Sequence, residues 1–197
     1  MSQDAPMYTI LGIDPGLAAT GFAVARVQGR SDVIESVLAV GLIESKVDYD
    51  LGNKSNGQVS RAGWLNTILA NFVSEYEVDA IACEMPFISP QAFANFAHGL
   101  TMGAIAALNI PMMLVRPHQV KAAALRRSAT KRDVIAWALS VTEKDSLPWP
   151  TSKTPNRLGL TFEGKQVASY AEHLADALAA IQAGIRTREW LCAPDRA

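Results

Sequence analysis

Residues 11–22 read LGIDPGLAATGF, and this stretch carries the first indication of both the fold and the chemistry. An apolar run ends on Asp14, the chain turns at Pro15-Gly16, and a second apolar run begins at Gly21. The carboxylate therefore lies at the edge of a predicted core, where an unpaired charge is costly. Two explanations stay open from this stretch alone. Asp14 stabilises the turn by bonding to its own backbone, or it holds a metal ion.

The composition is that of an ordinary globular protein. The chain has 197 residues, of which 49% are hydrophobic and 19% charged, and this length suffices for a sizeable core. We expect one domain over residues 1–197, with a flexible loop at about 44–60, an insert at about 144–167 and a tail at 186–197. The net charge of −1 argues against a protein that coats nucleic acid through bulk charge.

The sequence offers no targeting or membrane segment. No apolar run is long enough to span a membrane, and the first residues, MSQDAPMYT, lack the basic and apolar regions of a secretory signal. Cys83 and Cys192 are far apart and form no CxxC pattern, which indicates neither a disulfide framework nor a zinc site. We therefore expect a cytoplasmic protein with no membrane partner.

Hydrophobic patterning predicts an α/β fold. Three strands come first, separated by short turns, and should pair as antiparallel neighbours. Helices and strands then follow, so that the sheet is mixed and helices pack on it, in the order of the ribonuclease H-like fold with a five-stranded sheet. The predicted strands are 8–14, 21–27, 33–43, 78–84 and 112–115; the predicted helices include one that starts at Ser89-Pro90 and ends near residue 108, then 118–125, 130–139 and 168–183, the last capped by Gly184.

Acidic residues recur at the ends of these elements. Asp14 ends the first strand and Glu84 ends the fourth, and in a mixed sheet these strands can be neighbours. In the last helix, AEHLADALAAIQAG, His173 and Asp176 are three residues apart and share one face. Small alanines continue that face, so that it can approach the sheet closely. The alternative is an alanine-rich core helix with a solvent-facing His and Asp. Several carboxylates at one edge are what a site for two divalent ions requires.

A basic stretch runs from residue 116 to residue 132 and contains no acid. Such a cluster is either a solvated helical face or a patch that contacts phosphates, since attraction to nucleic acid depends on where charge is placed. Its basic residues are Arg116, Lys121, Arg126, Arg127, Lys131 and Arg132.

Four blocks of the sequence, taken in order, resemble the RuvC family of Holliday-junction resolvases. They are ILGIDPGLAATGFAVA, IACEMPFISPQAFANFAHGLTMGAIAAL, VRPHQVKAAALRRSATKRDVIAWAL and HLADALAAIQAG, within residues 8–184. The resemblance implies a crossover-junction endodeoxyribonuclease that cuts four-way or other branched DNA as a homodimer and leaves ligatable nicks. It also implies two-metal-ion hydrolysis with Mg²⁺, for which Mn²⁺ substitutes.

The resemblance also implies roles for individual residues. The metal-site residues are Asp14, Glu84, His173 and Asp176, and these are also catalytic together with Lys121. Whether His173 is a ligand or a proton carrier stays open. Lys121 and Lys131 match basic residues near the scissile phosphate, and Arg126, Arg127 and Arg132 extend this DNA-binding set.

Two further matches have plain structural alternatives. Phe87 matches an aromatic residue that stacks into the opened junction, and the alternative is a buried loop phenylalanine. Gly99 and Gly103 match a small-residue spacing associated with dimer packing, and the alternative is close contact between helix and sheet.

The sequence departs from the family pattern at two places. Leu125-Arg126-Arg127-Ser128 stands where the family usually has glycines, and the insert at 144–167 is longer than in typical bacterial members. This divergence suggests a phage or mobile-element version, in which case the protein would act in the host cytoplasm. Coupling to a branch-migration motor stays open.

Parts of the sequence are also compatible with other functions. An actin-like ATPase also opens with a strand and Asp-x-Gly, but it needs two such subdomains and a second phosphate loop, for which 197 residues leave no room. An RNA-processing member or a non-catalytic nucleic-acid-binding member of the same superfamily remains as an alternative.

Overall fold

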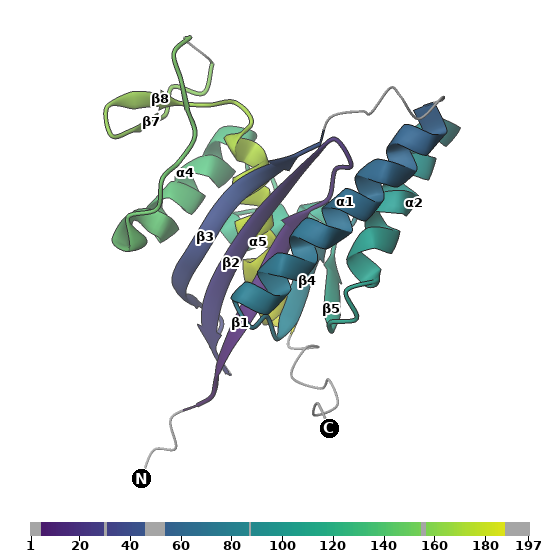
Figure 1. The fold of residues 1–197 in the computed structure, drawn as a ribbon. Helices are drawn as coiled ribbons and strands as arrows, with labels where there is room; N and C mark the ends of the chain where they lie inside the picture. Colours follow the sequence, from purple (N-terminus) through teal and green to yellow (C-terminus); the bar gives the residue numbers. More distant parts are fainter. Residues whose placement is uncertain (1–4, 30, 46–53, 87, 155–156, 188–197) are drawn as a thin grey trace.

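A mixed five-stranded sheet forms the centre of the molecule (Figure 1). The computed structural model describes residues 5–29, 31–45, 54–86, 88–154 and 157–187. The sheet has the order β3-β2-β1-β4-β5, with β1–β2 and β2–β3 antiparallel and β1–β4 and β4–β5 parallel. The strands are β1 (Met7–Asp14), β2 (Ala19–Gln28), β3 (Ile34–Glu44), β4 (Ala80–Glu84) and β5 (Met112–Val115). The predicted α/β fold with a mixed sheet is confirmed.

Helices cover both faces of the sheet because its central strands are apolar on both sides. Leu11 and Ile13 of β1 pack in one core with α1 (Lys54–Glu75) and α2 (Ala92–Ala106). Ile10 points to the opposite face, in a second core with α3 (Pro117–Ala124), α4 (Lys131–Thr142) and α5 (Ala171–Thr187). This alternation follows the period of two of a strand.

Helix α5 approaches the sheet unusually closely. A Cβ placed on Gly12 would lie 2.1 Å from the carbonyl oxygen of Ala177, and one placed on Gly21 would lie 2.1 Å from the carbonyl oxygen of His173. Only glycine fits at these two positions of β1 and β2. The predicted close packing of an alanine face is therefore completed by glycines on the strands, which the sequence analysis did not single out.

Three sequence predictions about element ends are wrong. The predicted loop at 44–60 is shorter, because β3 includes Glu44 and α1 already begins at Lys54; residues 46–53 lie outside the described residues. The helix predicted to start at Ser89-Pro90 starts at Ala92, with Gln91 as its N-cap, and the Asn95 side chain bonds back to the Ser89 backbone.

The third error concerns Gly184, which was predicted to cap the last helix. The helix continues to Thr187, and Gly184 lies inside it against the sheet. A Cβ there would lie 3.1 Å from Cβ of Ala82 and 3.2 Å from the sulfur of Met113. This glycine therefore serves close packing on β4 and β5 rather than termination.

The insert predicted at 144–167 forms a small sheet of its own. After a short 3₁₀ turn (Glu143–Asp145), three short strands follow in the order β6-β8-β7: β6 (Thr151–Ser152), β7 (Thr161–Phe162) and β8 (Lys165–Val167). In Figure 1 this sheet lies beyond the N-terminal end of α5. Among the described residues, no helix is both long and apolar enough to cross a membrane.

Candidate active site

Asp14 and Glu84 lie side by side at one edge of the sheet. Ile13 of β1 pairs with Cys83 of β4 in parallel register, so that the next residue on each strand is an acid. Both acids lie on the face of the sheet that α5 covers. Gly12 and Ala82, two residues earlier on each strand, contact that helix, and residues two apart on a strand share a face. The predicted convergence of the two carboxylates is a direct result of this register.

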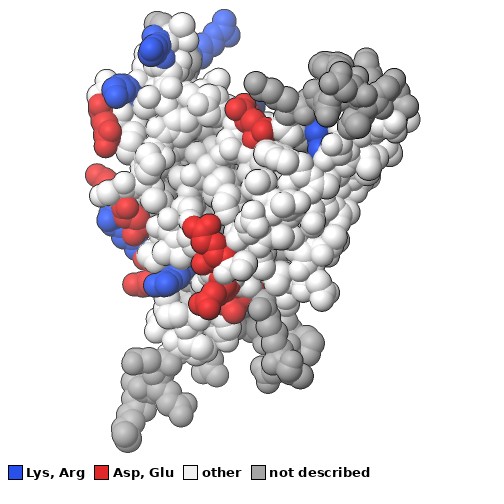
Figure 2. All heavy atoms as spheres, viewed as in Figure 1, with Lys and Arg blue, Asp and Glu red and all other residues white. Residues whose placement is uncertain are grey.

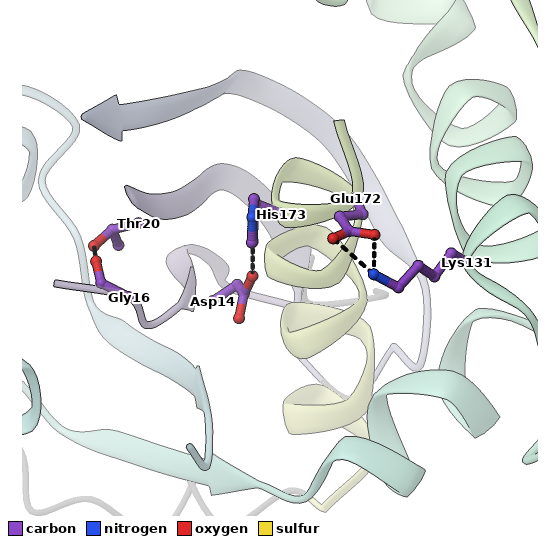
Figure 3. Close-up of polar contacts among 6 residues, drawn as sticks. All are labelled: Asp14, Gly16, Thr20, Lys131, Glu172 and His173. Carbon is purple, nitrogen blue, oxygen red and sulfur yellow. Dashed lines mark hydrogen bonds and ion pairs between the residues drawn. The ribbon is translucent and has the colours of Figure 1, made fainter. Parts of the chain in front are cut away.

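His173 and Asp176 reach the same edge from the first turns of α5. Nδ1 of His173 lies 2.6 Å from Oδ2 of Asp14, and the ring donates a hydrogen bond to the carboxylate (Figure 3). Within the described part of the chain, the Asp14 side chain forms no hydrogen bond to the turn that follows it. Thr20 bonds to the carbonyl of Gly16 there instead, with an oxygen-to-oxygen distance of 2.6 Å. The turn explanation for Asp14 is therefore wrong.

The acids repel one another in a partly buried place. Burial, followed by the charges of Asp176 and Asp14, raises the pKa of Glu84 from 4.5 to about 8. Burial, followed by Asp14 and Glu172, raises the pKa of Asp176 from 3.8 to about 7. Lys121 opposes both shifts, which places its charge near the two carboxyl groups. The edge thus gathers more negative charge than the protein neutralises.

The pKa of His173 is raised as well, but in a histidine this rise favours the charged form. Its hydrogen bond to Asp14 raises the pKa of His173, and the charges of Asp14, Glu172 and Asp176 add to this effect against the opposing effect of burial. The bond also fixes the ring, since Nδ1 is engaged by Asp14 and Nε2 is left for another partner.

Glu172 is a residue that the sequence analysis missed. Its carboxylate oxygens lie 2.6 and 2.9 Å from Nζ of Lys131, at the start of α4 (Figure 3). The hydrogen bond to Glu172 raises the pKa of Lys131. The pair joins two elements that are 41 residues apart, so no local pattern could have revealed it. Lys131 is thereby tethered beside His173.

The other sequence-predicted residues are exposed or lie outside the described residues. Lys121, Arg126, Arg127 and Arg132 are exposed on α3, on α4 and on the turn between them. Phe87 lies outside the described residues, so its stacking role stays a prediction. Gly99 and Gly103 are exposed on α2, and a Cβ at either would meet nothing within 4 Å. The alternative that these glycines permit close contact between helix and sheet is therefore wrong.

The donor set fits a divalent cation. Carboxylate oxygens are hard ligands, and a histidine nitrogen is compatible with Mn²⁺ as well. The raised pKa values of Glu84 and Asp176 indicate an uncompensated negative site that a cation would relieve. In the part of the chain that the structure describes, no group of three or more acidic, histidine or cysteine side chains forms a preformed metal-binding site.

A mixed sheet of this order with acids at one edge defines a ribonuclease H-like α/β protein, and comparison with solved structures agrees. RuvC of Thermus thermophilus, solved with a Holliday junction substrate, superposes with a TM-score of 0.62 at 20% identity, covering 91% of this chain and 95% of that one.

Sequence comparison then identifies the family. The family model described as crossover junction endodeoxyribonuclease RuvC matches residues 10–150. RuvC of Photorhabdus laumondii is 35% identical over 133 residues, which are 66% of this chain and 70% of that relative. RuvC of Chlorobium phaeovibrioides is 28% identical over 150 residues, 74% of this chain and 75% of that relative. The chain belongs to the RuvC family. The family match includes Asp14 and Glu84 and ends before α5.

Proposed function

We propose that this protein is a structure-selective DNA endonuclease that resolves four-way or other branched junctions and leaves ligatable nicks. Its family relatives carry the name crossover junction endodeoxyribonuclease. The observation that carries the proposal is that four metal-ligating side chains gather at one edge of the sheet: Asp14, Glu84, His173 and Asp176. Asp14 ends β1, Glu84 ends β4, and the other two lie on α5.

The acids are proposed to hold two Mg²⁺ ions, with Mn²⁺ as a substitute. Asp14, Glu84 and Asp176 offer oxygen ligands, and His173 offers a nitrogen. When bound, two divalent ions supply positive charge that activates water and stabilises the leaving oxygen of a phosphodiester displacement. The close packing of α5 at Gly12 and Gly21 fixes the positions of His173 and Asp176 relative to the strands.

Basic residues around the edge are proposed to bind the DNA backbone. The charge of Lys121 opposes the raised pKa values of Glu84 and Asp176, which supports a contact between Lys121 and a phosphate at the same edge. The exposed Arg126, Arg127 and Arg132 extend this positive surface, with Lys131 tethered by Glu172 at its border. Phosphate contacts of this kind position DNA without reading its sequence. Phe87 is proposed to stack on a base at the opened crossover.

A homodimer is proposed to assemble through α2. This helix carries no Lys, Arg, Asp or Glu, and the side of the molecule formed by α1 and α2, at the right of Figure 2, shows almost no charged atoms. Phe93 and Phe96 are 47% and 41% exposed there, on the same side of α2 as Gly99 and Gly103. An exposed apolar surface with small residues is suited to burial against a second copy.

Cleavage of a synthetic four-way junction tests the function. We expect the wild-type protein to cut the junction, but not a continuous duplex, and only with Mg²⁺ or Mn²⁺. Asp14→Asn and Glu84→Gln should abolish cutting and leave junction binding largely intact, since the amides keep the size of the side chains but lose the charge. Cutting by either variant at a near wild-type rate would refute the assignment.

A further inference from the structure

A hollow of about 380 Å³ opens beside the acidic site at the edge of the sheet. His173 and Glu172 form one wall, so the hollow shares a residue with the acidic site. Lys131, Arg157, Ser169 and Tyr170 form the rest of its polar and aromatic lining. The proposed nuclease chemistry assigns no role to Tyr170 or Arg157.

The insert supplies one side of this hollow and is firmly anchored. Trp149 is buried, and its indole nitrogen donates to the hydroxyl of Thr142 at 2.8 Å. The backbone amide of Ala168 donates to the carbonyl of Pro150 at 2.8 Å, and Val167, the last residue of the insert, is fully buried. These contacts hold both ends of the insert against the rest of the molecule. The family match ends at residue 150, so the side of the hollow that the insert supplies lies beyond the matched residues.

The lining has the chemistry of a nucleotide site. Tyr170 is 46% exposed and offers a ring on which a base can stack. Arg157 is exposed and, among the described residues, forms no ion pair, whereas Lys131 is held by Glu172. A guanidinium can bind a phosphate through two hydrogen bonds. An aromatic ring and a cation that line the same hollow can thus hold the base and the phosphate of one nucleotide.

We propose that this hollow binds one unpaired nucleotide of the cut strand, next to the scissile phosphate, with its base on Tyr170 and a phosphate at Arg157. The inference rests on the proposed function, because the shared His173 sets the hollow beside the cutting site. A base within a continuous duplex is paired and stacked on its neighbours and has no free face to offer. The hollow therefore selects strands that are unpaired or unstacked at the cut, as at a branch point.

Photocrosslinking tests this contact without requiring cleavage. A synthetic four-way junction carries 5-iodouracil at each nucleotide near the cut in turn, and is irradiated with the protein in EDTA. We expect one position to crosslink to Tyr170 in the wild-type protein and to residue 170 in Tyr170→Phe, because both rings stack. Tyr170→Ala should lose that crosslink, whereas Lys165→Ala, which removes an exposed cation of the same insert outside the hollow, should keep it.

Single-turnover cleavage completes the test. An abasic nucleotide at the crosslinked position should slow the wild-type protein about 10-fold, and Tyr170→Ala should be slow on the intact strand and insensitive to the abasic change. Arg157→Ala should lower the slope of log affinity against log salt by about 0.7 on a single strand. Crosslinking without any cleavage would support the hollow and contradict the nuclease activity. Cleavage with no crosslink near the cut, or with equal abasic effects in the wild type and Tyr170→Ala, would overturn the hollow and leave the nuclease activity standing.

Discussion

At the residue scale, the acidic edge is a place where function opposes stability. Glu84 and Asp176 are partly buried beside Asp14, and their pKa values are raised because burial and the neighbouring negative charges disfavour the ionised carboxylates. Replacing one of these acids by an amide would remove part of the repulsion without changing the size of the side chain. Retaining them is reasonable if a divalent ion supplies the missing charge.

The stability of the metal-free protein should therefore fall as pH rises. Because the folded pKa values, about 8 and about 7, exceed the ordinary ones, the folded state binds more protons than the unfolded state between pH 4 and 8. The destabilisation is absent below the ordinary pKa values and complete above the raised ones. We expect the melting temperature in EDTA to drop from about pH 5 to about pH 8.5.

Glu84→Gln serves as the matched comparison for this prediction. It removes the charge, so its melting temperature should decline less over the same pH interval, and it should exceed that of the wild type at the alkaline end. Parallel curves for the two proteins would show that Glu84 does not carry the effect.

His173 should give the enzyme a distinct dependence on pH and metal. A histidine binds metal only when neutral, and the hydrogen bond to Asp14 raises its pKa, so protons should compete with the metal up to a higher pH than for a free imidazole. We expect His173→Asp to stay active, to shift preference from Mn²⁺ toward Mg²⁺, and to tolerate lower pH, because a carboxylate is the harder ligand. Rates against pH in both metals measure this. Severe slowing at saturating levels of either metal would instead assign His173 a proton-carrying role.

Individual residues differed in how far the sequence could predict them. Asp14 and Glu84 were predictable because each ends an apolar strand, and strand period fixes the face. Glu172 was not, since its partner Lys131 is remote in sequence and the contact depends on how α4 docks on α5. Gly12 was also missed, because a glycine inside an apolar strand does not reveal which helix will lie against it.

At the element scale, the position of α5 on the sheet controls the site. Two strand glycines set the separation, and the helix in turn carries His173 and Asp176 to the strand ends. The long elements were predictable from their periodicity. The strands β6, β7 and β8 were not, because two or three residues contain no measurable period and their pairing depends on the turn at Glu163-Gly164, where both residues have positive φ.

Enlarging either strand glycine should displace α5. In Gly21→Ala the new methyl would press on the backbone of His173, and in Gly12→Ala on that of Ala177. We expect each variant to lose about 1–3 kcal/mol of unfolding free energy, as for other overpacked cores, and to cut junctions far more slowly than the stability loss alone explains. Urea denaturation and single-turnover rates measure the two effects.

Gly63→Ala is the control for these variants. It lies in α1 with nothing within 4 Å of the added Cβ, and should gain about 0.5–1 kcal/mol from helix propensity without a change in cutting. A Gly21→Ala protein with wild-type stability and rate would contradict the proposed role of the close approach.

At the scale of the whole molecule, the two faces of the sheet have different chemistry. The face of α3, α4 and α5 leads to the acidic edge and the exposed basic residues around it, whereas α2 on the other face presents phenylalanines and glycines with no charge. A four-way junction has two equivalent strands to cut. One molecule with one acidic edge can address one of them, so a second copy related by two-fold symmetry is suited to the pair.

Charging the uncharged face should separate the two copies without unfolding either. Gly103 is exposed on α2 and has open space around its Cβ position, so Gly103→Arg should fold as the wild type does. In a dimer that packs through this face, the same arginine would be buried against its counterpart as an unpaired charge. We expect sedimentation velocity to show a dimer for the wild type and a monomer for Gly103→Arg.

On a junction labelled on both cut strands, the variant should yield single nicks where the wild type yields paired ones. Ala136→Arg adds the same side chain at an exposed position of α4 and should remain dimeric. A Gly103→Arg protein that sediments as the wild type does would show that the dimer does not form through α2. A wild type that is monomeric at all concentrations would contradict the proposed dimer itself.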